Sequence, residues 1–83
     1  MAKFRKKPVV IDAIQWAGNF DAIRDFVGGA EDVLWLNGDG TVDVPTLEGM
    51  MIAKRGDWII RGVEGEFYPC KRAIFEATYE KVE

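Results

Sequence analysis

The residues best suited to bind a ligand lie between Gly56 and Cys70 and in the two basic residues that follow. This segment contains three aromatic residues, and Gly62 and Gly65 divide it into two short strands joined by a turn. An aromatic ring can stack on a planar ligand, and a cationic side chain beside it can hold an anionic group. We therefore predict a binding site for a nucleotide-like anion formed by Arg55, Trp58, Arg61, Tyr68, Lys71 and Arg72.

Strand geometry limits this prediction. Side chains alternate between the two faces of a strand, so Trp58 and Arg61 point to opposite faces unless a bulge or a subunit interface brings them together. The alternative interpretation is that the aromatic residues form the core, as is usual in so small a domain: Trp16, Trp35, Trp58, Phe67 and Tyr68.

The composition argues against most catalytic mechanisms. The chain has no histidine, which excludes Ser–His–Asp and Cys–His catalysis, histidine metal sites and the commonest general base. Cys70 is the single cysteine, and a small buried apolar role is favoured over a reactive thiol beside Lys71 and Arg72. We predict no catalytic residues, no metal site and no cofactor.

Carboxylates leave one enzymatic alternative open. Asp57, Glu64 and Glu66 lie in or beside the predicted hairpin, and a pair of carboxylates is the minimal set for a metal-dependent hydrolase. Their spacing is not diagnostic. Asp57 after Gly56 is more simply a turn residue that binds its local backbone.

Charge is unevenly distributed along the chain. The net charge is −3, and residues 1–7 hold four cations and no acid, whereas residues 8–53 hold eight acids and one arginine. A net negative protein is a poor general binder of nucleic acid. The basic residues at 1–7 and 54–72 could form one anion site, or the first group could be a solvated arm.

Hydrophobic periodicity and turn residues predict one helix and a series of short strands. Asn19 and Gly28-Gly29 are expected to cap a helix over residues 20–27 with an apolar stripe, followed by a tight Asn-Gly turn at 37–40. Pro45 should end a strand or mark an edge, and Pro69 should interrupt the ladder. Strands are expected over 9–16, 33–36, 41–44, 50–53, 58–61, 66–68 and 77–82, with one helical turn over 71–75.

These elements predict an α+β domain with a small, strongly bent antiparallel sheet or partial barrel covered by one short helix. Residues 1–7 form a basic N-terminal arm and residues 8–83 a single domain. A chain of 83 residues encloses little volume, so we expect a homo-oligomer. It has no apolar run of about 20 residues, so no membrane association is expected, and its lone cysteine favours the cytoplasm.

Three blocks of residues resemble a group of small phage and prophage proteins that carry a Pro-Gly-Asp-Tyr-Gly-type motif. The blocks are residues 6–16, Gly56-Asp57-Trp58-Ile59 and residues 65–70, and the likeness extends to residues 75–79. The motif itself departs at three positions, because Arg55 replaces Pro, Trp58 replaces Tyr and Ile59 replaces Gly. The resemblance implies a phage or prophage context in the bacterial cytoplasm and implies no reaction.

Three hypotheses for the function follow. The favoured one is a small non-enzymatic phage or prophage accessory protein that sequesters a nucleotide-like anionic ligand or engages a host protein. The second is a structural or assembly component of the virion. The third is a metal-dependent hydrolase that uses carboxylates.

Overall fold

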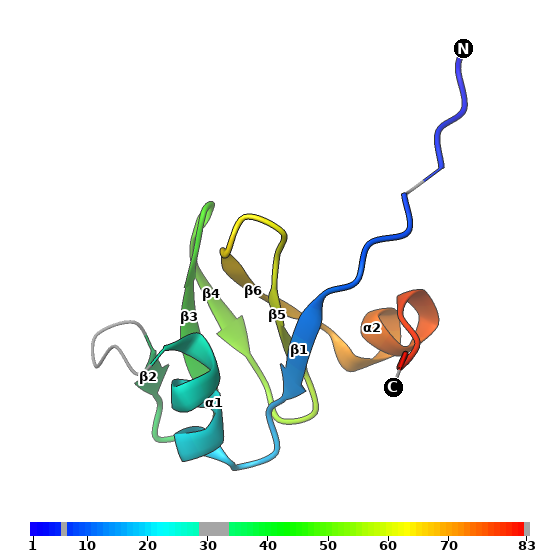
Figure 1. The fold of residues 1–83 in the computed structure, drawn as a ribbon. Coiled ribbons are helices and arrows are strands. Elements are labelled where there is room, and N and C mark those ends of the chain that lie inside the picture. The colour runs from blue at the N-terminus through cyan, green and yellow to red at the C-terminus, as the bar shows by residue number, and fades with distance from the viewer. Residues whose placement is uncertain (6, 29–33, 83) are drawn as a thin grey trace.

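The computed structural model describes residues 1–5, 7–28 and 34–82. In these residues the elements follow in the order β1 (Asp12–Gln15), α1 (Phe20–Val27), β2 (Trp35–Leu36), β3 (Val42–Thr46), β4 (Gly49–Ala53), β5 (Trp58–Arg61), β6 (Phe67–Cys70) and α2 (Arg72–Thr78). The predicted α+β class is confirmed. The strands form two antiparallel sheets and not one bent sheet, in the orders β1-β5-β6 and β2-β3-β4, and the described residues form no closed barrel (Figure 1).

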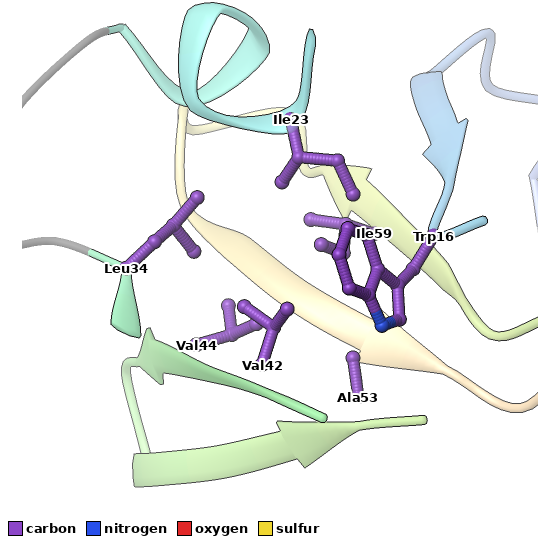
Figure 2. Close-up of a cluster of buried hydrophobic side chains, with 7 residues drawn as sticks. All are labelled: Trp16, Ile23, Leu34, Val42, Val44, Ala53 and Ile59. Carbon is purple, nitrogen blue, oxygen red and sulfur yellow. The ribbon is translucent and has the colours of Figure 1, made fainter. Parts of the chain in front are cut away.

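The hydrophobic core lies between the two sheets. Ile59 of β5 faces Val42 and Val44 of β3, and α1 contributes Ile23 at one end of the interface (Figure 2). Along β3, the buried Val42 and Val44 alternate with the half-buried Asp43, as expected for a strand with one face on the core. In β5 the adjacent Ile59 and Ile60 are both buried, so this strand is covered on both faces. The buried cluster consists of Trp16, Ile23, Leu34, Val42, Val44, Ala53 and Ile59.

Helix α1 confirms the predicted amphipathic stripe. Ile23 is fully buried, and Phe20, Phe26 and Val27 pack against the core. The prediction for Asn19 is wrong in detail, because its side chain accepts a hydrogen bond from the Ala17 amide and does not cap the helix. The helix ends at Gly28, whose φ of 108° is the left-handed conformation that favours glycine. Gly29 and Val33, which belong to the predicted helix cap and the next strand, lie outside the described residues.

The Gly56-Asp57 pair forms the turn that joins β4 to β5 and fixes the end of β1. The Gly56 amide donates to the Trp16 carbonyl at 2.7 Å, and the Trp16 amide donates to the Asp57 carbonyl at 2.8 Å. The Asp57 carboxylate accepts from the Lys54 amide at 2.9 Å, which confirms its predicted role in the turn. Gly56 has a φ of 96°, so a side chain there would be strained. The Gly56-Asp57 pair therefore stabilises the turn between β4 and β5.

Strand β1 is shorter than predicted. It begins at Asp12, which lies opposite Arg61, the last residue of β5. Residues 7–11 run past the end of β5, and among the described residues no strand pairs with them. Val9 and Val10 are consequently exposed, and the arm leads away from the sheets (Figure 1).

Pro45 and Pro69 lie inside strands. Pro45 belongs to β3, but β2 pairs only with Val42 and Asp43, so Pro45 has a hydrogen-bonded neighbour on one side only. This confirms its predicted edge position. Pro69 lies in β6 opposite Ile59, so the prediction that it interrupts the ladder is wrong. Strand β6 is at the edge of its sheet, where the missing amide hydrogen is tolerated.

The strand predicted at the C-terminus is absent from the described residues. Helix α2 covers Arg72–Thr78, and residues 79–82 form no strand, so the strand predicted over 77–82 is wrong. Phe75 and Tyr79 stack with centroids 5.0 Å apart, and Phe75 also stacks on Trp58 of β5. Contacts between residues far apart in the sequence thus favour the helix over its local β propensity. The helical turn predicted over residues 71–75 is confirmed, and the helix extends to Thr78.

Candidate functional site

Trp58 lies on the face of the β1-β5-β6 sheet that turns away from the core. Its indole stacks on Phe75 of α2, with ring centroids 4.3 Å apart and planes within 10° of parallel. The Nε1 group is buried and has no acceptor among the described residues. Because α2 already supplies a stacking partner, one face of this ring is not available to a planar ligand.

Tyr68 shares this face of the sheet. It lies opposite Ile60 in the β5–β6 pair, two residues from the pair of Trp58 with Cys70. Burial raises the pKa of the Tyr68 phenol, and the neighbouring Tyr79 raises it further through charge and a hydrogen bond. The phenol is therefore protonated at neutral pH and contributes to the packing of α2 as a neutral group.

Arg61 lies on the opposite face, as its position in the strand predicts. Its guanidinium is 4.8 Å from the centroid of Phe26 and 5.4 Å from that of Phe67, and it donates to the Phe26 carbonyl. Asp12 lies 3.8 Å from the same group. A cation at the last turn of a helix interacts favourably with its carbonyl groups. Arg61 therefore contacts α1 through Phe26, β1 through Asp12 and β6 through Phe67.

We expect Arg61→Ala to lower the free energy of unfolding by about 1–3 kcal/mol, because it removes a charged hydrogen bond and two cation–ring contacts. Arg61→Lys should lower the free energy of unfolding by less, because lysine keeps the positive charge although it lacks the planar guanidinium. Urea denaturation followed by circular dichroism measures both. The control is Arg72→Ala, which breaks only an exposed pair with Glu76 and should cost less than about 0.5 kcal/mol. Equal losses for Arg61→Ala and the control would contradict this role.

The other predicted cations are exposed and lie apart. The Arg55 guanidinium is 5.7 Å from the centroid of the Trp16 ring and lies against Gly18. Lys71 precedes α2, and Arg72 pairs with Glu76 at 3.0 Å. Trp58 and Tyr68 thus lie on the face of the sheet that α2 covers, near Lys71 and Arg72 at the start of that helix. Arg61 lies on the opposite face against α1, and Arg55 lies beside Trp16. The six predicted residues do not line one cavity within a single chain.

The candidate catalytic carboxylates stabilise turns. Asp57 binds the Lys54 amide, and Glu66 accepts a hydrogen bond from the Glu64 amide at 3.0 Å. The Glu66 carboxylate also lies against Gly62, where a Cβ atom would collide with it. Glu64 is exposed at the tip of the turn, as predicted. These contacts are local, and the described residues contain no group of three or more acidic, histidine or cysteine side chains placed to hold a metal ion.

A broad apolar surface covers the side of the β2-β3-β4 sheet that turns away from the core. Trp35, Asp43 and Ile52 lie opposite one another on three adjacent strands, and Pro45 and Met50 form the next row. Paired residues share a face of the sheet. Trp35 is 67% exposed, Met50 63% and Ile52 59%. We call these five residues the outer face.

The sequence interpretation missed the outer face because it placed Trp35 in the core. The same reasoning was correct for Trp16, which is 1% exposed. The alternation of Val42 and Val44 with Asp43 indicated a strand with one buried face. Which face Trp35 would occupy depends on its register with β3, and a two-residue strand carries too little alternation to define that register.

A groove of about 330 Å³ is lined by residues of the β3–β4 hairpin and by the start of β6. Leu47 and Glu48 of the β3–β4 connection line one side together with Met51 of β4, and residues 66–69 at the start of β6 line the other. This volume is at the lower end of the range for ligand pockets, about 300–1,000 Å³. We call it the hairpin groove. It combines apolar side chains with two carboxylates, Glu48 and Glu66.

Comparison of the chain with family models, with curated proteins and with solved structures found no match. Among the residues that the structure describes, no helix has the length and apolar character needed to cross a bilayer.

Proposed function

We propose that the protein is a small non-enzymatic accessory protein of a phage or prophage that engages another protein through its outer face. The observation that carries this proposal is the exposure of Trp35, Met50 and Ile52 on one side of the β2-β3-β4 sheet. Large apolar side chains clustered on a surface are typical of protein interaction sites. Aromatic residues and methionine are enriched at such sites.

The geometry of the outer face suits a protein partner. Its backbone belongs to a paired sheet, so the side chains are held in fixed positions before binding. Asp43 lies between Trp35 and Ile52, and its carboxylate accepts a hydrogen bond from the Asn37 side chain at 3.0 Å. A flat apolar surface with one oriented acidic group favours a partner with an apolar patch and a donor at its centre.

This proposal favours a protein over a nucleotide-like ligand. The predicted stacking residue Trp58 is covered on one side by Phe75, and Arg61 is occupied by the end of α1. The outer face, by contrast, has large side chains exposed to solvent. It offers no deep cavity of the kind that buries most of a small ligand's surface.

The test is site-specific photocrosslinking in bacterial cells that naturally carry the gene. A benzophenone amino acid at position 52 should form a crosslink to a host or phage protein, and Trp35→Glu in the same chain should reduce its yield at least about tenfold. The control position is 63, because Val63 is 72% exposed and lies on the β5–β6 turn, outside the outer face. Both variants should keep the wild-type melting temperature within a few degrees.

Two results would contradict this proposal. Equal crosslinking from positions 52 and 63 would show that the outer face has no special role. Crosslinks at position 52 only to further copies of the chain would assign the face to self-assembly and favour the virion or assembly component.

A further inference from the structure

The N-terminal arm carries a binding motif that its own domain leaves unused. Phe4 is 94% exposed, and Lys3 and Arg5 flank it. Residues 1–7 hold four cations and no acid. An aromatic residue between cations is suited to an apolar pocket with acidic groups at its rim.

The hairpin groove has the complementary character. Leu47, Met51, Phe67 and Pro69 supply apolar walls, and Glu48 and Glu66 supply the carboxylates. Glu48 is exposed, and one oxygen of Glu66 already accepts from the Glu64 amide, which fixes the orientation of that carboxylate. The arm and the groove thus match in both polarity and charge.

The fold directs the arm away from the domain that carries it. Strand β1 begins opposite the end of β5, and residues 1–5 and 7–10 are exposed and lead away from the sheets (Figure 1). Pro8 restricts its own φ and favours an extended conformation for the residue before it. An extended, outward-pointing arm is positioned to reach another molecule.

We propose that the arm of one copy docks in the hairpin groove of a second copy, with Phe4 in the apolar groove and Lys3 and Arg5 beside Glu48 and Glu66. Reciprocal exchange of two arms gives a closed dimer with two identical contacts. This site is separate from the outer face, so the dimer leaves the outer face open for a partner.

Sedimentation velocity of the full chain over a range of concentrations tests the proposal. We expect a monomer–dimer equilibrium that weakens at least about tenfold in Phe4→Ala, because burial of the ring is lost. Dimerisation should also weaken between 50 and 500 mM salt, since charge pairs near the surface are screened. The control is Val63→Ala, which truncates another exposed apolar side chain, outside the groove.

A second measurement locates the contact. A fluorescent peptide of residues 1–11 should bind the full-length Phe4→Ala protein, whose groove is intact, and Leu47→Lys in that protein should abolish binding. Peptide binding is read from fluorescence anisotropy, with a Phe4→Ala peptide as the control. Phe4→Ala is expected to keep the melting temperature, because the ring is exposed in the domain.

Three outcomes would overturn the proposal. A chain that remains monomeric at all concentrations has no arm exchange, and peptide binding to such a monomer would assign the groove to the arm of the same chain. A dimer that Phe4→Ala leaves unchanged uses another surface. Peptide binding that Leu47→Lys leaves unchanged places the arm outside the hairpin groove.

Discussion

Trp16→Ala is expected to lower the free energy of unfolding by about 3–5 kcal/mol, the loss typical of a buried aromatic residue. The Trp16 side chain is 1% exposed and extends from the end of β1 into the buried cluster (Figure 2). Its Nε1 group donates to the Gly40 carbonyl at 2.8 Å, so the substitution also leaves that carbonyl without its donor. A domain of this size has little stability in reserve, and we expect the variant to be largely unfolded at 37 °C.

Guanidinium denaturation followed by circular dichroism measures this effect, and Trp35→Ala is the matched control. Both changes remove an indole, but Trp35 is 67% exposed and should cost less than about 1 kcal/mol. Trp16→Phe should cause an intermediate loss in the free energy of unfolding, because it keeps a ring in the core but removes the hydrogen bond to Gly40. Equal losses at positions 16 and 35 would contradict the assignment of Trp16 to the core and Trp35 to the outer face.

Trp58→Ala is expected to release α2 from the sheet and to cost about 2–3 kcal/mol, below the loss for a fully buried ring. The helix has no fully buried residue of its own, so the Trp58–Phe75 stack is a main contact that holds it. Hydrogen exchange should show faster exchange of the α2 amides while the core strands keep their protection.

The control for this prediction is Trp58→Phe. It keeps a ring to stack on Phe75 and removes the buried Nε1 group, which has no acceptor among the described residues. Removing an unsatisfied donor offsets part of the lost contact area, so the cost should stay below about 1.5 kcal/mol. Unchanged exchange of the α2 amides in Trp58→Ala would show that the helix is held by other contacts.

The outer face and the hairpin groove are formed by different residues. The outer face lies on β2, β3 and β4, whereas the hairpin groove lies between the β3–β4 connection and β6. Substitutions can therefore separate the two proposals. Loss of the crosslink in Trp35→Glu with normal dimerisation would support the outer face alone, and loss of dimerisation in Phe4→Ala with a normal crosslink would support the arm alone.

Local chemistry in the sequence predicted several elements well. The 3.6-residue spacing of Phe20, Ile23, Phe26 and Val27 predicted α1, because an apolar stripe of that period fits only a helix on a core. The Asn-Gly turn at 37–40 and the Gly62–Gly65 turn were also predicted, since few residues tolerate the backbone conformations of tight turns. Alternation along β5 correctly separated Trp58 from Arg61.

Where β1 begins and which way Trp35 faces were decided by tertiary contacts. Pairing of Asp12 with Arg61 ended β1 where β5 ended, and pairing with β3 turned Trp35 outward. Stacking of Phe75 on Trp58 accompanies the extension of the predicted helical turn to Thr78. Each outcome depends on a partner distant in the sequence, and propensity and periodicity describe only neighbours along the chain. For the same reason, the outer face and the hairpin groove became visible only when the strands were placed side by side.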